Sequence, residues 1–394
     1  MKIVYSISLI LVTLAAVNAS PISGRNLEFA HKEPTVVPLK RNVDYKRNFQ
    51  DLADKTTRRY SRRGVETTPL ADFDQEFFVE AYIGTSKQYF RLLPDTGSAD
   101  TWVPGINCTE GGCASSRNRF SPAESATSEE QNGNFSIAYG DGTNVSCLAY
   151  KDTVAIGNAI ADGQAIGVAT FIASNLGIQE YDGILGLSFL AIAASKTSPF
   201  MDTLFANGVV PDEVFSIAMP PTGAGELALG GINPKWYNDP LLDVPLTGQN
   251  LWQVQVQDIA WGDETLTSGY DTLIDSGTSM ITVSNETAKA LHSKIDHARP
   301  YEEDSIFWVI PCNTQETFRF QIGDSWYTIP HSVKHAGAVA QGSSECVSSV
   351  TGGAPTDCWI LGKPFFAGYY SVFDKTNARI QFAPLVEKKA DVSP

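Results

Sequence analysis

The feature that most limits how this chain can fold is a four-residue motif that occurs twice, 180 residues apart. The copies are Asp95-Thr96-Gly97-Ser98 and Asp275-Ser276-Gly277-Thr278, and each precedes an Ile-Leu-Gly sequence, which begins 89 residues on at Ile184 and 85 residues on at Ile360. One Asp-Thr/Ser-Gly sequence is common in turns. Two copies with matching order and spacing indicate an internal duplication. We therefore expect two similar lobes, divided within the Pro- and Asp-rich stretch 233–245.

The sequence around these motifs favours strands. Residues 77–83 form a mostly apolar run, and residues 254–259 alternate between apolar and polar, as a half-buried strand does. The chain contains 32 glycines and 21 prolines, and it is 43% hydrophobic but only 19% charged, which suits a turn-rich body with a large core. The strongest helix signal runs from Glu286 to Ile295, with Asn285 as the expected cap. This pattern predicts an all-β body.

The duplicated motif can bring two carboxylates together. The glycine after each aspartate lets another backbone approach closely, so two facing loops would make Asp95 and Asp275 neighbours. Two carboxylates in contact cannot both ionise, so one stays protonated while the other acts as a base. Such a pair can activate a water molecule and protonate a leaving amine. This chemistry needs no metal and no cofactor, and we expect neither.

Charge is distributed unevenly along the chain. Residues 1–63 contain 12 lysines and arginines against five acids, whereas the remaining residues contain 17 against 39. The overall net charge of −15 argues against nucleic acid as a partner, because phosphate recognition needs clustered lysines and arginines. A basic arm ahead of an acidic body either lies on that body or binds an outside partner, such as a membrane or another protein.

The first 19 residues resemble a secretory signal peptide. Lys2 precedes an apolar run from Ile3 to Val17, and small residues stand before the expected cut at Ala19. A buried helix or membrane anchor is the alternative, but the run is shorter than the roughly 20 residues of a spanning helix. The expected segments are a signal peptide at 1–19, a basic propeptide at 20–63, an N-terminal lobe at 64–240 and a C-terminal lobe at 241–394. We expect a monomer that is secreted, with the vacuole as the alternative, and that does not attach to a membrane.

Cysteine usage fits an oxidising compartment. Cys108 and Cys113 can close a tight loop through a disulfide, and the alternative of a metal site lacks a nearby histidine. Sequons for N-linked glycosylation, Asn-x-Ser/Thr, follow the signal peptide at four positions, namely Asn107, Asn134, Asn144 and Asn285.

Taken together, the motifs resemble those of the pepsin-like aspartic endopeptidases, in a fungal-type form with signal peptide and propeptide. The resemblance runs from about Pro69 to Ala383 and implies the bilobed acid-protease fold, with Asp95 and Asp275 as the catalytic aspartates. Besides the two aspartate motifs, it rests on the segments 139–143, 359–362 and 370–374, which read Tyr-Gly-Asp-Gly-Thr, Trp-Ile-Leu-Gly and Tyr-Ser-Val-Phe-Asp.

The resemblance also implies roles for neighbouring residues. Thr96 and Ser276 would interlock the two active-site loops, while Ser98 and Thr278 would hydrogen-bond the carboxyl groups beside Gly97 and Gly277. Tyr139, Gly140 and Asp141 would form a flap over the substrate, with Trp102 supporting the tyrosine. Tyr139 as an ordinary hairpin aromatic, and Trp102 as an ordinary core residue, are the alternatives. The implied disulfides are Cys108–Cys113 and Cys312–Cys346.

Some positions depart from the family pattern. Pro94 stands before Asp95, where a bulky apolar residue is usual, and predicts a local bulge because proline lacks a backbone N–H. Ala99 and Asp100 replace the more usual Ser-Asn. Cys147 and Cys358 either pair or remain thiols, and we favour thiols. The tight C-x3-C loop of the second lobe is missing.

Other classes of protein fit less well. His331 and His335 are four residues apart, but Pro330 precedes them and no glutamate of the metalloprotease pattern lies between them, so a surface position is favoured over a metal site. No G-x-S-x-G sequence of a serine hydrolase is present. The rival that shares the fold is a catalytically weak or inactive binding protein, which only Pro94 supports.

The sequence thus predicts an aspartic endopeptidase that is active in acid. The resemblance implies polypeptide substrates with large hydrophobic residues around the cut, and inhibition by pepstatin-type compounds. The chain's own propeptide is a further expected partner, because its cations would lie on the acidic cleft at neutral pH and leave as the carboxylates protonate. Arg59-Tyr60 resembles the Lys-Tyr pair of pepsin-type zymogens, which implies that at neutral pH it lies near the two aspartates. Arg62-Arg63 offers a dibasic cut after the arm is released.

Overall fold

The structure of the protein is a computed structural model, whose larger unit spans Glu33–Pro394. The structure describes residues 34–41, 77–109, 111–113, 117–140, 142–176, 181–238, 240–248, 250–303, 305–340, 342–354 and 358–386. The expected signal peptide, most of the expected propeptide, including 59–63, and Asp141 of the expected flap lie outside these residues.

Strands dominate the described residues, which confirms the all-β prediction. In the part of the chain up to Leu229, called the first half below, they are β1 (Thr35–Arg41), β2 (Phe77–Ile83), β3 (Gln88–Asp95), β4 (Trp102–Pro104), β5 (Glu129–Ala138), β6 (Asn144–Ile156), β7 (Ala159–Ile172), β8 (Gly183–Gly186), β9 (Val214–Ala218) and β10 (Gly225–Leu229). In the second half they are β11 (Leu242–Pro245), β12 (Gln253–Trp261), β13 (Glu264–Ile274), β14 (Ile281–Thr282), β15 (Arg299–Pro300), β16 (Trp308–Pro311), β17 (Phe318–Ile322), β18 (Ser325–Thr328), β19 (His335–Ala338), β20 (Glu345–Ser348), β21 (Val350–Thr351), β22 (Cys358–Leu361), β23 (Tyr369–Asp374) and β24 (Arg379–Pro384).

Helices are short. They are α2 (Phe200–Ala206), α3 (Asn285–His292) and α4 (Lys363–Phe366), together with the single 3₁₀ turns η1 (Pro122–Glu124), η2 (Ser174–Leu176), η3 (Leu190–Ile192), η4 (Pro234–Trp236) and η5 (His331–Val333). The helix expected at 286–295 exists, but its cap is not Asn285. The side chain of Ser284 accepts the hydrogen bond from Thr287 N at 3.1 Å, and Asn285 is already the first helical residue.

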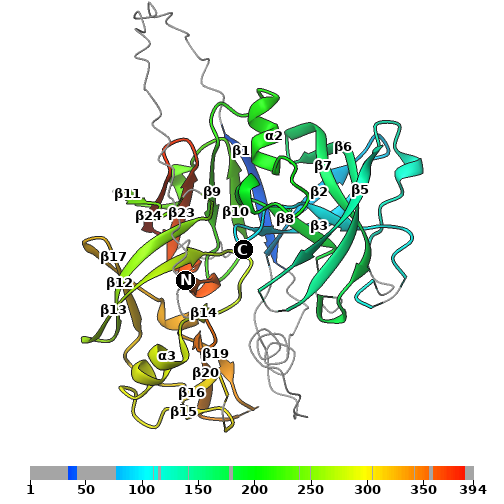
Figure 1. The fold of residues 1–394 in the computed structure, drawn as a ribbon. Coiled ribbons are helices and arrows are strands. Elements are labelled where there is room, and N and C mark those ends of the chain that lie inside the picture. Colours follow the sequence, from blue (N-terminus) through cyan, green and yellow to red (C-terminus); the bar gives the residue numbers. More distant parts are fainter. Residues whose placement is uncertain are drawn as a thin grey trace, which may run out of the picture. The chain divides into compact units, whose positions relative to one another are not determined.

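Among the described residues the strands form three sheets, of 13, seven and four strands. The 13-stranded sheet has the order β11-β24-β23-β9-β10-β1-β2-β3-β8-β4-β7-β6-β5, so strands from both ends of the chain lie in one sheet (Figure 1). Within the stretch 233–245, η4 is followed by β11, which pairs with β24.

The two halves repeat one local arrangement, as expected from the duplicated motif. In the first half β3 runs parallel to β8, and β8 is antiparallel to β4. In the second half β13 runs parallel to β22, and β22 is antiparallel to β14. The glycine of each Ile-Leu-Gly sequence explains its repetition, because a Cβ on Gly186 would collide with the backbone of Ala99 and one on Gly362 with the carbonyl of Thr278.

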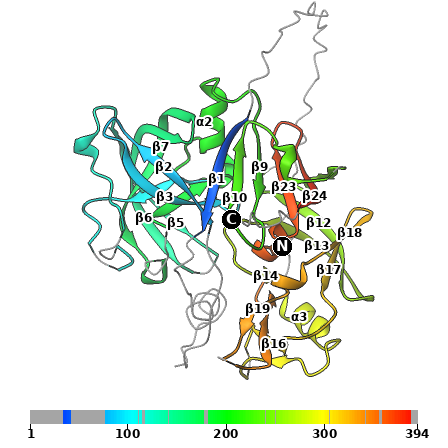
Figure 2. The ribbon, with the colours of Figure 1, turned by 180° about the vertical axis from the view of Figure 1, so that it is seen from behind.

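Strand β1 comes from the basic arm rather than from either expected lobe. It pairs antiparallel with β10 along Thr35–Leu39 and with β2 at Lys40 and Arg41, which Figure 2 shows from behind. Val37 and Leu39 are buried in the core, and Lys40 forms a 2.7 Å ion pair with Glu80. This part of the arm is therefore a strand within the 13-stranded sheet.

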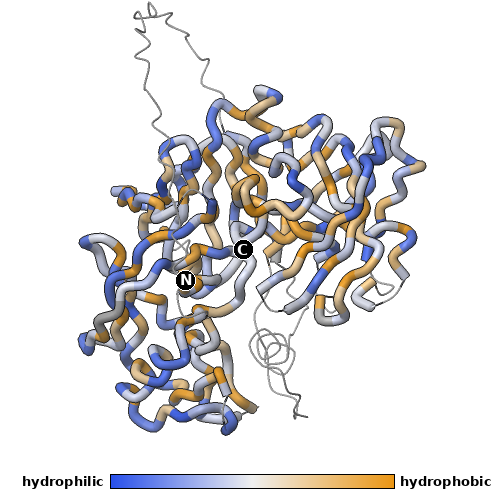
Figure 3. The backbone as a smooth tube through the Cα atoms, viewed as in Figure 1, coloured by the Kyte–Doolittle hydropathy of each residue, from blue (hydrophilic) through white to orange (hydrophobic). Residues whose placement is uncertain are grey.

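The core follows the alternation in the sequence, and Figure 3 shows apolar and polar residues alternating along many strands. Residues 77–83 coincide with β2, and 254–259 lie within β12, where Val254 and Val256 are buried. Both strand predictions are confirmed. The buried ring of Trp252 packs against the rings of Phe189, Phe215 and Phe373.

Candidate active site

The two motif aspartates face each other. Asp95 ends β3 and Asp275 directly follows β13, and both side chains are buried. A Cβ on Gly97 would lie 2.7 Å from the Asp275 carboxyl carbon, and one on Gly277 would collide with the Asp95 carboxyl group. Each glycine is therefore required because the opposite carboxyl group lies directly over it.

Hydrogen bonds between Thr96 and Ser276 interlock the two loops. Thr96 Oγ1 donates to Ile274 O at 2.8 Å and accepts from Ser276 N at 3.0 Å. In the reciprocal set, Ser276 Oγ donates to Pro94 O at 2.9 Å and accepts from Thr96 N at 3.1 Å. Both side chains have no exposed surface, so four backbone groups from the two halves depend on these hydroxyls.

Each carboxyl group is held by its own loop. Asp95 Oδ1 accepts from Gly97 N at 2.9 Å, and Asp275 Oδ1 accepts from Gly277 N at 2.8 Å. The second oxygens accept from hydroxyls, Asp95 Oδ2 from Ser98 and Asp275 Oδ2 from Thr278 at 2.5 Å. All four carboxyl oxygens thus accept a hydrogen bond from their own loop, which fixes the orientation of the two carboxyl groups.

The electrostatics of the pair favour one proton on Asp95 at acid pH. Burial and the negative charge of Asp275 raise the pKa of Asp95 well above that of an ordinary aspartate, although Ser98 and the Gly97 amide oppose the shift. A protonated Asp95 can donate a hydrogen bond while its neighbour carries the negative charge. The arrangement can therefore supply an acid and a base within one site.

The bulge expected from Pro94 is absent. Strand β3 pairs with β8 in continuous register, with Pro94 opposite Leu185 and Asp95 opposite Gly186. The carbonyl oxygen of Pro94 accepts from Ser276 Oγ in the other half of the chain, so it points away from β8. The nitrogen and the carbonyl group of one residue in an extended strand point to the same side, so the nitrogen of Pro94 also points away from β8. The missing N–H of Pro94 consequently costs no hydrogen bond within the sheet. Pro94 therefore no longer supports the alternative of an inactive binding protein.

Tyr139 lies at the tip of the hairpin formed by β5 and β6. Its phenol accepts a 2.7 Å hydrogen bond from the indole N–H of Trp102, which is fully buried on β4. The turn is closed by hydrogen bonds from Tyr139 N to Thr143 O and from Gly142 N to Tyr139 O, both at 2.9 Å. The two residues expected to act together are thus in contact, and the ring of Tyr139 is fixed at the edge of the cleft.

A cleft of about 380 Å³ lies over the aspartates. Its lining includes Asp95, Asp275, Tyr139, Gly140 and Thr278, which the sequence singled out. Its apolar part also includes residues to which the sequence had assigned no role in binding, namely Leu93, Ile137, Leu176, Tyr181, Ile184 and Ile360. Among these, Ile184 and Ile360 begin the Ile-Leu-Gly repeats, whereas nothing in the spacing of Leu176 or Tyr181 distinguished them.

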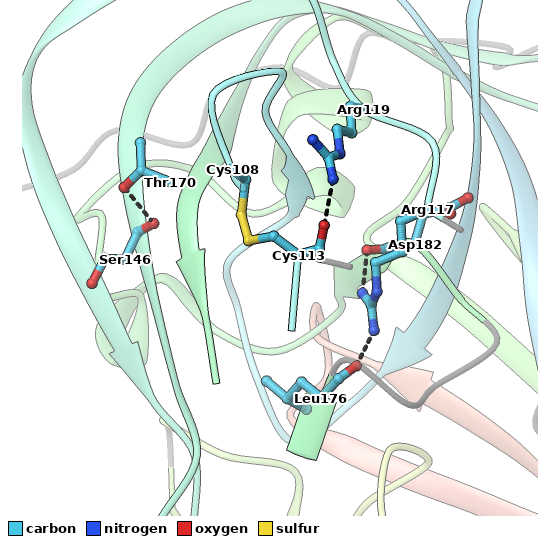
Figure 4. Close-up of a disulfide and its surroundings, with 8 residues drawn as sticks. All are labelled: Cys108, Cys113, Arg117, Arg119, Ser146, Thr170, Leu176 and Asp182. Carbon is cyan, nitrogen blue, oxygen red and sulfur yellow. Dashed lines mark hydrogen bonds between the residues drawn. A yellow bond between two sulfur atoms is a disulfide. The ribbon is translucent and has the colours of Figure 1, made fainter. Parts of the chain in front are cut away.

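One wall of the cleft rests on a buried polar network that the sequence did not predict (Figure 4). Arg117 donates to the carbonyl oxygens of Leu176 and Asp182, the latter at 2.7 Å, and its guanidinium lies over the Tyr181 ring. The buried carboxylate of Asp182 accepts from Arg91 N at 2.8 Å and from Asn118 N at 2.9 Å. These contacts hold Leu176 and Tyr181 beside the cleft.

The cysteines form two disulfides in the structure. Cys108 joins Cys113 next to this network, as Figure 4 shows, and Cys312 joins Cys346 in the second half. Cys147 is a buried thiol on β6, and burial raises its pKa. Cys358 lies on β22, where its sulfur accepts from Gln253 Nε2 at 3.4 Å. The structure thus agrees with two thiols rather than a third disulfide.

Metal ligands are not gathered in the described part of the chain, where no group of three His, Cys, Asp or Glu side chains could hold an ion. His331 lies in η5 and His335 in β19, so they do not share the face of one helix.

Two facing, interlocked aspartate loops beneath a hairpin, in a fold of two related β lobes, define the class of aspartic proteases. Comparison with known proteins agrees: residues 76–385 match the family model described as "Eukaryotic aspartyl protease". The chain is 30% identical over 380 residues to "Aspartic protease" of Phaffia rhodozyma, covering 93% of this chain and 91% of that protein. It is 31% identical over 327 residues to "Pepsin A" of Sus scrofa (80% and 83% covered) and 30% identical over 378 residues to "Cathepsin E-A" of Xenopus laevis (89% and 93%). The chain therefore belongs to the eukaryotic aspartyl protease family and is a pepsin-like aspartic endopeptidase.

Proposed function

We propose that this enzyme cleaves polypeptides in acid with Asp95 and Asp275 as its catalytic pair. Asp275 as carboxylate removes a proton from a water molecule, and the oxygen of that water attacks the scissile carbonyl. Asp95 as carboxylic acid donates a hydrogen bond to the carbonyl oxygen. Asp275 then passes the proton that it took from water to the leaving nitrogen as the C–N bond breaks, so both aspartates return to their starting states. The observation that carries this proposal is the contact of the two buried carboxyl groups across the interlocked loops.

The test is substitution of each aspartate by asparagine. Asp95→Asn and Asp275→Asn should each remove nearly all cleavage of denatured haemoglobin or casein in acid, while circular dichroism stays unchanged. Asp324→Asn is the matched control, because Asp324 is exposed in a turn after β17. Pepstatin should abolish the cleavage by the unaltered enzyme. Near-normal activity of Asp275→Asn would refute the assignment.

The lining of the cleft supports a substrate preference for large apolar residues around the cut. Leu93, Leu176, Tyr181 and Ile184 present apolar surface beside Asp95, and an extended peptide can meet it through alternate side chains. Peptides with Phe or Leu on both sides of one bond should be cut faster than the same peptides with Ser or Asp there. Equal rates for the two sets would exclude the preference.

The basic arm acts, in this proposal, as a propeptide that is removed by cleavage near Arg62-Arg63. Its described segment, β1, is held in the sheet next to β10, and none of the cleft-lining residues among those described comes from β1. Contact of the arm with the cleft would therefore come from residues that lie outside the described ones. N-terminal sequencing of the active enzyme should find Gly64, or a residue within about ten positions after it.

The enzyme is proposed to work outside the cytosol, as a secreted or vacuolar protein. The four sequon asparagines, on which N-linked glycans would be attached, are exposed at Asn107, Asn134, Asn144 and Asn285. Among the described residues no helix is long and apolar enough to cross a membrane. Treatment of the purified protein with an N-glycosidase should lower its mass if these sites are used.

A further inference from the structure

Trp252 links two backbone segments that hold the aspartate loops, one at Leu187 and one at Ile274. Its indole Nε1 donates to the carbonyl oxygen of Leu187 at 2.9 Å, and Leu187 N in turn donates to the carbonyl oxygen of Asp95 at 2.9 Å. On its other side, the carbonyl oxygen of Trp252 accepts from Ile274 N at 2.9 Å, and Ile274 directly precedes Asp275. Three hydrogen bonds therefore lead from the backbone of Asp95 to the residue before Asp275.

The indole has little freedom to move. Trp252 is 1% exposed, and its ring centroid lies 4.6 Å from that of Phe189, 5.1 Å from that of Phe373 and 5.7 Å from that of Phe215. Phe189 and Phe215 belong to the first half of the chain, whereas Phe373 lies on β23. A ring enclosed by rigid aromatic partners from both halves keeps its N–H group at a fixed point.

This contact is independent of the Thr96–Ser276 interlock. The interlock joins the loops themselves, whereas Trp252 joins the segment after β8 to β13, the strand that ends directly before Asp275. Loss of the indole N–H would leave the buried carbonyl of Leu187 without this donor, so the segment would have to shift toward another donor. Displacements of about 1 Å are enough to lower catalysis strongly.

We propose that Trp252 is a positioning residue that fixes the spacing of the two catalytic aspartates through its indole N–H. The inference rests on the proposed function of Asp95 and Asp275. It assigns to Trp252 no contact with substrate. Its contribution is to keep the carboxyl groups close enough to share one proton.

The test compares two tryptophans that are equally buried. Trp252→Phe removes the N–H donor and keeps an aromatic ring. Trp359→Phe is the matched control, because Trp359 is fully buried and stacks on Tyr270, yet its indole nitrogen has no hydrogen-bond partner among the described residues. We expect kcat of Trp252→Phe to fall about tenfold, the equivalent of one buried hydrogen bond, with KM within about twofold of the unaltered enzyme. Trp359→Phe should retain its kcat.

The pH profile separates positioning from general destabilisation. If the aspartates move apart, their repulsion weakens, so the basic limb of the kcat/KM profile should move to lower pH in Trp252→Phe only. Thermal unfolding should show that the variant is folded at the assay temperature. If Trp252→Phe does not fold, 3-benzothienylalanine at position 252 replaces the N–H by sulfur with little change in shape, and the same kcat and pH shifts are expected.

Unaltered kcat and pH profile in Trp252→Phe, or in the benzothienyl variant, would overturn the inference. An equal loss of kcat in Trp359→Phe would also overturn it, because loss of core packing would then explain the effect of Trp252→Phe without the indole N–H. Neither result would affect the assignment of Asp95 and Asp275, which depends on the asparagine variants. Conversely, an Asp275→Asn enzyme with normal activity would refute the proposed function before Trp252 is tested.

Discussion

At the scale of single residues, the site depends on hydroxyl groups as much as on carboxyl groups. Thr96 and Ser276 have no exposed surface and satisfy backbone groups of the opposite loop. A buried polar group that loses its partner costs the full desolvation penalty. The identity of these two residues is therefore set by hydrogen bonding, and an apolar residue of the same shape cannot replace them.

Thr96→Val should lower the free energy of unfolding by about 3 kcal/mol, because it strips the partners from Ile274 O and Ser276 N. Urea unfolding measures the change. The control is Thr101→Val, since the hydroxyl of Thr101 is buried without a hydrogen-bond partner among the described residues. That variant should be neutral or slightly stabilised, and equal losses in both variants would contradict the interlock argument.

How far the site can be predicted from the sequence also depends on the residue. Asp95, Asp275 and their neighbours were predictable because a short motif occurs twice. Trp252 and Asp182 were not, because they act through partners distant in the chain, Leu187 for one and Arg91 and Asn118 for the other. The cap of α3 shows the local limit, since Ser284 and Asn285 are both good caps and only the backbone conformation decides between them.

At the scale of elements, the hairpin of β5 and β6 has paired strands and a short turn that lines the cleft. Its strands pair from Glu129 to Ala138 and from Asn144 to Lys151, while the tip projects over the cleft through Tyr139 and Gly140. If this hairpin closes on a substrate as a lid, it will exclude water from the cleft. Its aromatic residue should therefore matter more for turnover than for folding.

Tyr139→Ala should reduce kcat/KM at least tenfold and change the melting temperature little, because the ring is only partly buried and lines the cleft. Peptide cleavage and thermal unfolding measure the two effects. Tyr150→Ala is the control, since Tyr150 is a partly buried residue of the same hairpin that packs against the core. The reverse result for Tyr139, normal turnover with a lower melting temperature, would make it an ordinary hairpin aromatic.

The two disulfides should differ in their effect on stability. Cys312–Cys346 spans 34 residues and Cys108–Cys113 only five. On loop entropy alone, removing the first should cost about 4 kcal/mol and removing the second about 2 kcal/mol. Paired Cys→Ser variants unfolded in urea provide the comparison. A larger loss for the Cys108–Cys113 pair would show that the loop beside Arg117 contributes more than chain entropy.

At the scale of the whole molecule, the charge balance and the aspartate pair act in the same direction. The residues after 63 carry 39 acids against 17 bases, so repulsion within the body grows as pH rises. Burial and Asp275 raise the pKa of Asp95, so the folded protein binds that proton more tightly than the unfolded chain does. The stability from Asp95 is therefore complete below the ordinary aspartate pKa and is lost as pH rises through the raised value.

Asp95→Asn should reduce the loss of stability between about pH 4 and pH 8, because asparagine has no proton to lose. Urea midpoints at the two pH values measure this loss for the variant and for the unaltered enzyme. Asp324→Asn, which changes the net charge equally, should keep the full loss. If the two variants behave alike, general repulsion rather than the aspartate pair governs the pH dependence.

The fold class itself was predictable, since both the alternation of residues and the duplicated motif point to paired β lobes. The sequence did not predict that one sheet contains β9, β10, β23 and β1. Pairing between strands that are distant in the chain produces no repeat or spacing pattern that the sequence could show. The basic arm was expected to lie on the cleft because of its charge. Its described part is held instead by backbone pairing and by the buried side chains of Val37 and Leu39.

If proteolysis removes the arm, the place of β1 between β10 and β2 becomes free for another strand. A cut after Arg63 would sever the chain but leave β1 hydrogen-bonded to β10 and β2, so the first product would be a two-chain complex. Departure of that peptide would leave unpaired N–H and C=O groups on the facing edges of β10 and β2. It would also leave empty the two apolar sites that Val37 and Leu39 fill. Such edges invite another strand, so the segment exposed by the cut, or a second molecule, would compete to fill them. If the arm is removed by such a cut, maturation therefore also has to fill the vacated position in the 13-stranded sheet.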